Sequence, residues 1–419
     1  MLALAIIAAL AVAAGACSSA SSSGAKTPPH EANTRAAVAP AKVAPVDTPA
    51  PTSTREVLKP HDTRPGYWNI VAYTFISPTE GWLIRTNTLW AGGRSPAQIL
   101  HTSDGGDTWT VQYETSDFSP VSITMLDDQH GWVGGGTGDH CLDPRGDRPA
   151  CTVAILTTAD GGRTWAGPSV QVPGVTGDTS VEGSPAGWAV AGRATGSAGN
   201  TRMDVFTVRQ DGAVWDDVLT EGRGLLTDFA LAASDASHAV VITGATQYVT
   251  ADGGVTWQDS TSPCSQDALG LRTGYVMASF ALSPSNVWLL CMSSLTSGTS
   301  ELRTLVHTAD GGATWEVLGQ AGTTLPGTGK VSANDIAPSL DFLDPMHGWY
   351  ASGGPERGVY RTSDGGHTWQ SVQAPAPHVT DVQFVDPDHG WVAMGVGAYT
   401  SQLARTTDGG AHWTVLPLP

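Results

Sequence analysis

Basic residues are scarce in this chain. Its 419 residues include 21 Lys and Arg against 39 Asp and Glu, which gives a formal net charge of −18. Residues 18–66 hold six of the basic and four of the acidic residues, so residues 67–419 carry −20 and have Lys330 as their single lysine. Such a surface repels nucleic acid and anionic lipid. The charge therefore favours protein, glycan or cationic partners, or serves only to keep the protein soluble.

The chain also lacks a membrane-spanning length at its apolar amino terminus. The run Leu2–Ala14 is too short to cross a bilayer, and it ends in Ala-Gly-Ala before Cys17 and a Ser-rich stretch. This pattern resembles a bacterial lipobox, although no Lys or Arg precedes the apolar run. We therefore predict a lipoprotein signal peptide over residues 1–16 and lipidation of Cys17, which would make the protein an exported, membrane-anchored component of the bacterial cell envelope. An ordinary cleaved signal peptide and a secreted protein are the alternative.

Sustained periodicity is missing from the segment that follows. Residues 17–66 are rich in Ser, Ala, Pro and Thr. A segment of this composition buries too little apolar surface to fold by itself. It predicts a disordered tether between the lipid anchor and a folded domain over residues 67–419.

Motifs that would carry catalysis or bind a cofactor are absent as well. The sequence contains no nucleophile elbow, no phosphate-binding loop and no zinc motif. We accordingly predict no catalytic residue, no metal and no cofactor.

Trp and Gly are plentiful by contrast, and they recur in register. One motif occurs seven times. Its first copy is Thr-Ser-Asp-Gly-Gly-Asp-Thr-Trp, and one copy, Gln210–Trp215, is degenerate. Its aspartates, 41 to 58 residues apart, are Asp104, Asp160, Asp211, Asp252, Asp310, Asp364 and Asp408. Repeats of about 40 to 50 residues are typical of β-propeller blades.

A second motif, usually Gly-Trp, alternates with the first. It contains Trp82, Trp132, Trp188, Trp288, Trp349 and Trp391, with a copy lacking Trp around His238. The two motifs use 13 of the 15 tryptophans and leave only Trp68 and Trp90 without a place in the repeat.

The last repeat shows how one blade is built. Residues 379–385, 391–395, 403–406 and 413–416 read as strands separated by turns. Four antiparallel strands joined by short turns make one propeller blade. The sequence therefore predicts an all-β fold, a seven-bladed β-propeller of four-stranded antiparallel blades, with no strand exchanged to close the ring.

The aspartate of the first motif has a structural explanation. An Asp at the start of a tight turn accepts hydrogen bonds from backbone N–H groups about two residues further on, and the Gly pair supplies positive φ. The Trp then begins the outer strand and covers the apolar layer of the blade. Seven such aspartates lie in separate turns, so they cannot converge on one catalytic or metal site.

The first motif resembles the Asp-box, or BNR repeat, of sialidases, xyloglucanase-like glycosidases and sortilin-type receptors. The full pattern of strand, Gly-Trp and Asp-box is most similar to the photosystem II assembly and stability factor family, over about residues 67 to 419. The resemblance implies Asp-box turns and a role as a non-catalytic binding or assembly scaffold. It does not imply work on a photosystem, because one propeller architecture supports unrelated functions.

Four cysteines remain once Cys17 is set aside, an even number in an exported protein. Cys141 and Cys151 flank one loop, while Cys264 enters the fifth blade and Cys291 ends the second strand of that blade. We predict the disulfides Cys141–Cys151 and Cys264–Cys291, and two other connectivities remain possible.

The candidate binding residues lie on the face that carries the long loops between blades and between second and third strands. Trp90 and Arg94 belong to one such loop, although Trp90 could equally pack beneath its own loop. Asp178, Asp228 and Asp381 stand near the start of inner strands, where they could rim the central channel or could simply be solvated acids.

Two classes of function follow. The preferred one is a monomeric scaffold, tethered to the membrane only by lipid, that binds an envelope protein or glycan. The alternative is a glycoside hydrolase using paired carboxylates. A sialidase-like enzyme is disfavoured because the first arginine after residue 66, Arg85, is not part of an Arg-Ile-Pro signature. A xyloglucanase-like enzyme usually needs a second propeller, for which the chain has no room.

Overall fold

The computed structural model describes most of the chain beyond Tyr67. The described ranges are 68–87, 96–137, 152–167, 171–172, 180–184, 188–194, 200–209, 212–216, 222–223, 229–233, 235–243, 246–265, 274–283, 285–294, 301–320, 339–352, 358–372, 374–376, 378–397 and 400–419. The chain divides into two compact units, Met1–Asp47 and Thr48–Pro419, and every described residue belongs to the second. No helix in these ranges is long and apolar enough to cross a membrane.

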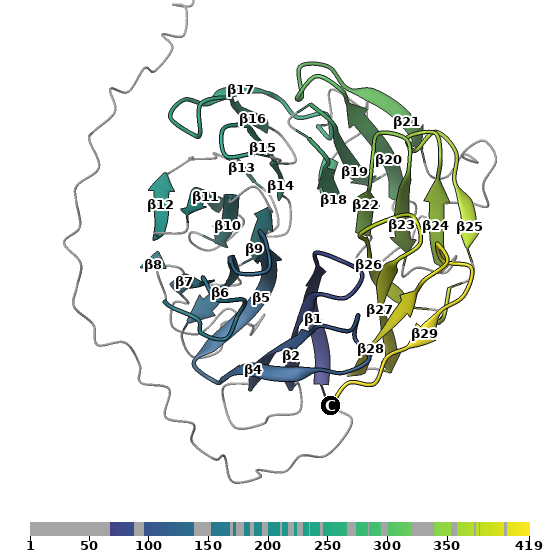
Figure 1. Ribbon diagram of the computed structural model, residues 1–419. Helices are drawn as coiled ribbons and strands as arrows, with labels where there is room; N and C mark the ends of the chain where they lie inside the picture. The colour runs from purple at the N-terminus through teal and green to yellow at the C-terminus, as the bar shows by residue number, and fades with distance from the viewer. Residues whose placement is uncertain are drawn as a thin grey trace, which may run out of the picture. The chain divides into compact units, whose positions relative to one another are not determined.

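Antiparallel sheets, each made from strands consecutive in the sequence, account for the described part of the second unit (Figure 1). Six of them are the predicted four-stranded blades. The first three are β1 (Trp68–Phe75), β2 (Gly81–Asn87), β3 (Ala97–Thr102) and β4 (Thr110–Thr115); β5 (Phe118–Met125), β6 (Gly131–Thr137), β7 (Thr152–Thr158) and β8 (Gln171–Val172); and β14 (Phe229–Ala233), β15 (Ala239–Thr243), β16 (Thr246–Thr250) and β17 (Gln258–Thr261).

The other three four-stranded blades complete the carboxyl-terminal half. They are β18 (Gly274–Ala281), β19 (Val287–Ser294), β20 (Glu301–Thr308) and β21 (Glu316–Gln320); β22 (Ser339–Phe342), β23 (Gly348–Ser352), β24 (Gly358–Thr362) and β25 (Gln370–Val372); and β26 (Val379–Phe384), β27 (Gly390–Gly397), β28 (Thr400–Thr406) and β29 (Thr414–Val415). The strands expected for the last repeat are all present, and its second and third strands extend further toward each other than predicted.

One sheet departs from the predicted blade, so the expectation of seven four-stranded blades is wrong. This sheet has five strands, which are β9 (Ser180–Ser184), β10 (Trp188–Ala194), β11 (Asn200–Arg209), β12 (Gly212–Asp216) and β13 (Gly222–Arg223). The long β11 explains the extra strand. Because β12 pairs only with the second half of β11, the first two residues of β11 remain available and pair with β13.

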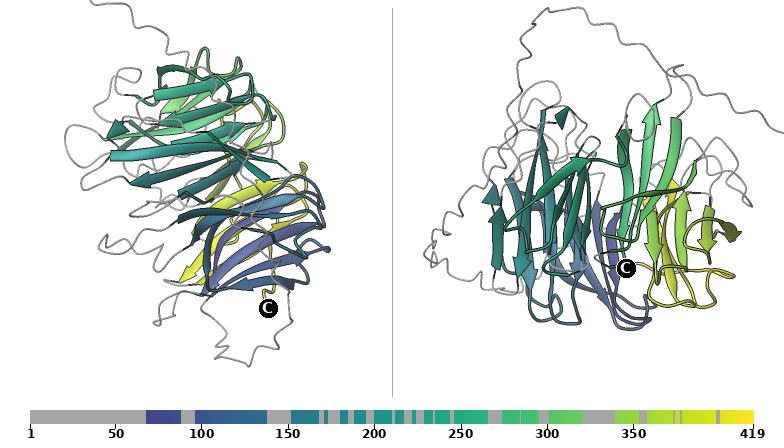
Figure 2. Two further views of the ribbon diagram at one scale, coloured as in Figure 1. Left: turned by 90° about the vertical axis from the view of Figure 1, so that its left-hand side faces the viewer. Right: turned by 90° about the horizontal axis from the view of Figure 1, so that it is seen from above.

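The inner strands close the sheets into a ring. Each of β1, β5, β9, β14, β18, β22 and β26 contacts the next in that order, and β26 contacts β1. Figure 2 shows the same sheets from the side. The first and last sheets each consist of their own consecutive strands, as predicted. Residues 53–60, the segment that might have supplied an exchanged strand, lie outside the described residues.

Stacked aromatic rings fill the spaces between neighbouring sheets. Phe75 in β1 stacks on Trp391 of the last sheet with ring centroids 3.6 Å apart, and Phe384 stacks on Trp349 of the preceding sheet at 3.8 Å. The pair Phe342 and Trp288 repeats the arrangement. Burial of these large rings between sheets is a main source of cohesion around the ring.

The same stacking requires the glycine of the Gly-Trp motif. Gly81 and Gly390 are the register partners of Phe75 and Phe384 across the first pair of strands in their sheets. A Cβ atom at Gly81 would lie 2.3 Å from the Phe75 ring, and one at Gly390 would lie 2.6 Å from the Phe384 ring. Only glycine leaves room for the aromatic ring beneath it.

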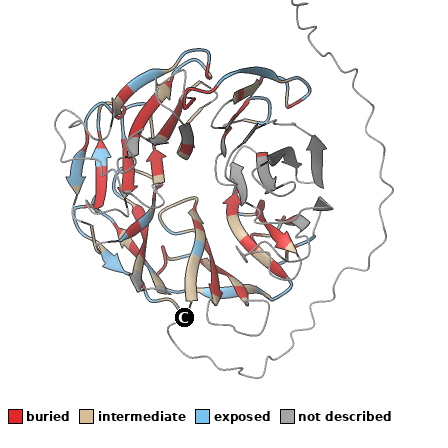
Figure 3. Cartoon of the chain, turned by 180° about the vertical axis from the view of Figure 1, so that it is seen from behind, coloured by how far each residue is buried: buried red, intermediate tan, exposed pale blue. Residues whose placement is uncertain are grey.

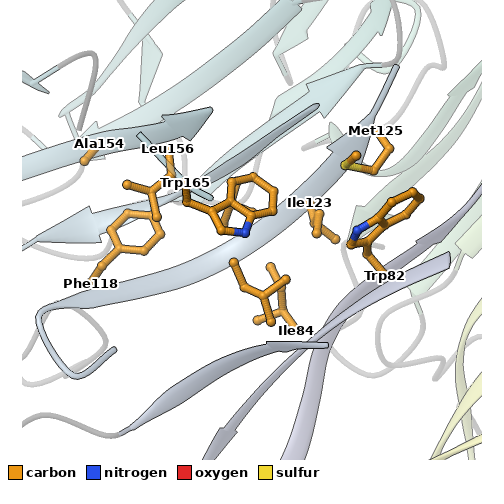
Figure 4. Close-up of a cluster of buried hydrophobic side chains, with 10 residues drawn as sticks. Trp82, Ile84, Phe118, Ile123, Met125, Ala154, Leu156 and Trp165 are labelled. Carbon is orange, nitrogen blue, oxygen red and sulfur yellow. The ribbon is translucent and has the colours of Figure 1, made fainter. Parts of the chain in front are cut away.

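In four sheets, the Trp of the Gly-Trp motif also bonds the next sheet, through Trp82, Trp188, Trp288 and Trp391. The indole Nε1 of Trp82 donates to the carbonyl oxygen of Gly161 at 3.1 Å, and that of Trp391 donates to Gly105 at 3.0 Å. Figure 3 shows buried residues along the middle strands and exposed ones on the outer strands. The cluster between the first two sheets is drawn in Figure 4, which labels Trp82, Ile84, Phe118, Ile123, Met125, Ala154, Leu156 and Trp165.

One predicted disulfide is present. Cys264 and Cys291 are bonded, both are fully buried, and they belong to the core cluster shared by the sheets β14–β17 and β18–β21. Cys17, Cys141 and Cys151 lie outside the described residues.

Candidate functional site

The aspartates of the repeated motif are held by their own turns, here called DGG turns. In the first turn, Thr102 Oγ1 donates to Asp104 Oδ1 at 2.8 Å, and Asp104 accepts both the backbone N–H and the hydroxyl of Thr108. Gly105 and Gly106 have φ of 74° and 102°, as predicted. The backbone N–H that donates to Asp104 belongs to Thr108, four residues further on, whereas the sequence predicted a donor about two residues further on. The two left-handed glycines lie between the Asp and this donor.

The other described DGG turns repeat this bonding. The equivalent aspartates are Asp160, Asp252, Asp310, Asp364 and Asp408, while Asp211 lies outside the described residues. Bonds from the Thr108 side chain and backbone lower the pKa of Asp104 to about 2, and the pKa values of Asp310 and Asp408 fall to about 2 for the corresponding reason. A carboxylate so occupied is a poor acid or base at neutral pH.

Of the five predicted binding residues, the structure describes one. Trp90, Arg94, Asp178 and Asp228 lie outside the described residues, whereas Asp381 belongs to the inner strand β26. Asp381 is half-buried and accepts hydrogen bonds from Ser339 Oγ on the neighbouring inner strand and from the backbone N–H of Val382.

A second carboxyl, which the sequence analysis missed, lies close to Asp381. Asp341 is buried in β22 and its Oδ2 accepts the backbone N–H of Phe384 in β26 at 2.5 Å. A polar residue inside the short strand Ser-Leu-Asp-Phe was the available signal. Both carboxyls therefore bond the free edge of β26 rather than lining an open cleft.

Tyr73 completes the cluster from the first sheet. Its side chain is buried, and its hydroxyl donates to the carbonyl oxygen of Trp391 at 3.1 Å. Burial raises its pKa well above the usual value, and the charges of Asp381 and Asp341 raise it further. Tyr73, Asp341 and Asp381 are called the inner carboxyl cluster below.

The cluster holds protons more tightly than isolated carboxyls do. Burial raises the pKa of Asp341 to about 7. The hydrogen bond from the N–H of Phe384 lowers this pKa, whereas the nearby charge of Asp381 raises it. Burial also raises the pKa of Asp381 to about 6, against the bond from Ser339. At Asp381 the backbone N–H of Val382 also opposes the effect of burial. Near neutral pH, therefore, Asp341 is divided between its neutral and charged forms.

The same position in the next sheet shows what Asp341 does mechanically. Gln383, like Asp341, precedes the stacked Phe of its inner strand. Its Oε1 accepts the N–H of Phe75 at 2.8 Å, and its Nε2 donates to the carbonyl oxygen of Phe75 at 3.2 Å. Asp341 and Gln383 thus occupy equivalent joints that fasten one inner strand to the next.

The described residues offer no cluster suited to a metal. In these ranges no three His, Cys, Asp or Glu side chains are placed to hold an ion. Four histidines before the second motif, His130, His238, His347 and His389, each bond the Asp three residues earlier in their own turn. The geometry therefore assigns the DGG-turn aspartates, Asp341, Asp381 and the aspartates that bond these histidines to turns and joints.

The fold defines the protein as a β-propeller. No family model matches the chain and no curated protein matches it. Among solved structures, YCF48 bound to D1 peptide is similar at 18% identity over 82% of this chain and 94% of that one, with a TM-score of 0.50. The β-propeller domain of the trilobed protease from Pyrococcus furiosus is similar at 8% identity, 84% and 96% coverage and a TM-score of 0.50.

A glycoside hydrolase also appears among the similar structures. The GH74 enzyme of Niastella koreensis matches at 14% identity over 83% of this chain and 69% of that one, with a TM-score of 0.34. That score is too low to support an argument. At these identities the likeness of the other two structures extends to the fold alone.

Proposed function

We propose that this protein is a non-catalytic binding or assembly scaffold of the bacterial cell envelope, built on an Asp-box propeller and tethered to the membrane through lipidated Cys17. The observation that carries the proposal is the occupation of the carboxyls in the DGG turns and in the inner carboxyl cluster. Those of the DGG turns bond their own turns, and Asp341 and Asp381 bond the edge of β26.

The partner is a protein or a glycan of the envelope. A structural neighbour, YCF48, is described as bound to a peptide, which supports binding as a use of this fold. The net charge of −20 on residues 67–419 favours a partner with cationic or hydrogen-bonding groups over nucleic acid or anionic lipid. The long-loop face, which includes Trp90 and Arg94, is the proposed contact surface.

Crosslinking in native envelopes, followed by affinity purification of the tagged protein, tests the binding role. The expected result is a discrete partner that is retained by Asp381→Asn, because the Asp381 carboxyl is occupied by Ser339 and by the backbone N–H of Val382. Anchoring is tested separately with Cys17→Ser, which should move the protein from the membrane fraction to the soluble fraction. A Cys17→Ser protein that stays in the membrane would contradict the lipid tether.

A glycoside hydrolase remains the second candidate because of one observation. Asp341 and Asp381 are neighbouring carboxyls with pKa values of about 7 and about 6, and carboxyls that differ in protonation can act as acid and base. A hydrolysis screen on xyloglucan, sialosides and envelope glycans distinguishes the two. The scaffold proposal predicts no sugar release, and release that is abolished by Asp341→Asn or Asp381→Asn would overturn it.

A further inference from the structure

A crevice of about 450 Å³ opens where the first two sheets meet at their turns. Its walls are the turn between β1 and β2, the turn between β5 and β6, and the DGG turn that follows β7. Residues lining it include Glu80, His101, Gln112, Asp128, Gln129 and Arg163. Its volume is within the range of small-molecule sites, roughly 300 to 1,000 Å³.

Hydrogen bonds between neighbouring elements hold the walls in place. Gln112 Nε2 and the indole of Trp82 both donate to the carbonyl oxygen of Gly161, and Gly161 N–H donates to Gln129 O at 2.8 Å. His101 contacts Trp82, with ring centroids 4.9 Å apart. The crevice is therefore formed before any ligand arrives, which lowers the entropic cost of binding.

The chain provides an internal comparison for this crevice. An equivalent crevice of about 330 Å³ lies between the sheets β14–β17 and β18–β21, and half of its lining residues are Ala or Val. The repeated motifs show which residues correspond in the two crevices. In the second crevice, His238 takes the position of Glu80, Val249 that of His101 and Ala313 that of Arg163. Because the junction forms with Val and Ala at two of these positions, the fold does not require the polar set of the first crevice.

A third junction shows charges that do satisfy one another. Arg405, at the position of His101, pairs with Asp107 at 3.0 Å across the boundary between the last and first sheets. In the first crevice Glu80 bonds His101 at 2.5 Å. Arg163 and Asp128 are exposed, and their side chains make no hydrogen bond or ion pair within the described ranges.

The available groups select one class of ligand. Asp128 and Arg163 are planar groups that each offer two or more hydrogen-bonding atoms, acceptors on the acid and donors on the guanidinium. Glu80 adds its second oxygen, Oε2, because its Oε1 bonds His101. A simple anion would face two carboxylates, and a simple cation would face the guanidinium. Adjacent hydroxyls, each able to donate and accept, match the mixed set.

We propose that the crevice between the first two sheets, lined by Glu80, His101, Asp128 and Arg163, binds a neutral sugar unit. The site lies at the turns, so it is separate from the long-loop face and from the inner carboxyl cluster. Failure of either proposal would leave the other standing.

Saturation-transfer NMR on the full chain tests the proposal. The probes are D-glucose, D-galactose and N-acetyl-D-glucosamine, with D-glucuronate and D-glucosamine as charged comparisons. At least one neutral sugar should receive saturation. Arg163→Ala and Glu80→Gln should each weaken its binding by about tenfold, since the first removes hydrogen bonds to a charged group and the second replaces a charged acceptor by a neutral amide. Arg163 is exposed, so its replacement should not affect folding.

His367→Ala is the matched control, because His367 occupies the position of Arg163 in another DGG turn. It should leave sugar binding unchanged. Three results would overturn the proposal: no transfer to any neutral sugar, transfer only to a charged probe, or equal weakening by Arg163→Ala and His367→Ala.

Discussion

Asp341 accepts the backbone N–H of Phe384 at 2.5 Å, and this bond fastens the inner strand β22 to the inner strand β26. The equivalent bond one sheet further on is made by a neutral amide, Gln383 to Phe75. The bond between β22 and β26 therefore depends on a side chain that gains and loses a proton, whereas the bond between β26 and β1 does not. This difference gives the most specific of the predictions that follow.

Asp341→Asn should reduce the pH dependence of stability. The pKa of Asp341 is about 7 in the folded protein, above its ordinary 3.8, so folding favours the protonated form. The stability that protonated Asp341 contributes is fully present below pH 3.8, its pKa in the unfolded chain. It is lost as pH rises through about 7, its pKa in the folded protein. It amounts to at most about 4 kcal/mol between about pH 4 and about pH 8.

Urea unfolding at about pH 5 and about pH 8 measures this effect. The wild type should lose more stability over that interval than Asp341→Asn, whose amide still accepts the Phe384 N–H. As a converse test, Gln383→Glu should add a similar loss. Identical pH profiles for wild type and Asp341→Asn would show that this joint does not titrate as described.

Asp104→Ala should destabilise the protein by about 1 to 3 kcal/mol, since it leaves the N–H of Thr108 and two hydroxyls without their acceptor. The pKa of Asp104 is lowered to about 2, so its contribution is present above pH 4 and is lost as pH falls through about 2. Thermal unfolding at neutral pH measures the change. Asp259→Ala, at an exposed site on β17, is the control and should change stability by less than about 0.5 kcal/mol.

Arg405→Ala should loosen the junction between the last and first sheets. Arg405 donates to the carbonyl oxygen of Asp104 at 3.0 Å and pairs with Asp107. Amide hydrogen exchange should increase around Asp104 and in β28, because local opening of that junction becomes easier. Arg361→Ala is the matched control, as Arg361 holds the same repeat position and is exposed. Equal exchange in the two variants would rule out a special role for Arg405 in closure.

Removal of the Cys264–Cys291 disulfide should lower stability by about 3 to 4 kcal/mol, given a sequence separation of 27 residues. Unfolding of the double variant Cys264→Ala, Cys291→Ala measures this effect. The loss arises because the unfolded chain regains the freedom that the crosslink removes. A double variant as stable as the wild type would contradict a stabilising role for the crosslink.

The repeat made most of the fold predictable. The DGG turn and the Gly-Trp motif are local, so the positive φ of Gly105 and the strand order of the last repeat followed from the sequence itself. The five-stranded sheet did not, because pairing of β13 with β11 depends on how far β12 extends along its neighbour. A locally encoded turn can be read from a repeat, whereas an extra edge strand cannot.

The candidate site was only partly predictable for a related reason. The position of Asp381 on an inner strand was recognisable, but its partners come from other sheets. Asp341 and Tyr73 acquire their roles only when β1, β22 and β26 meet. The crevice residues Glu80 and Arg163 likewise converge from separate repeats that no local pattern connects.

The scaffold role is tested most directly by crosslinking in intact envelopes. Lys330 is the single lysine of residues 67–419, so reagents that couple carboxyl groups suit this acidic surface better than amine-reactive ones. The account predicts a discrete crosslinked species containing this protein and one envelope component. Recovery of the uncrosslinked monomer alone, under conditions that crosslink other envelope assemblies, would contradict it.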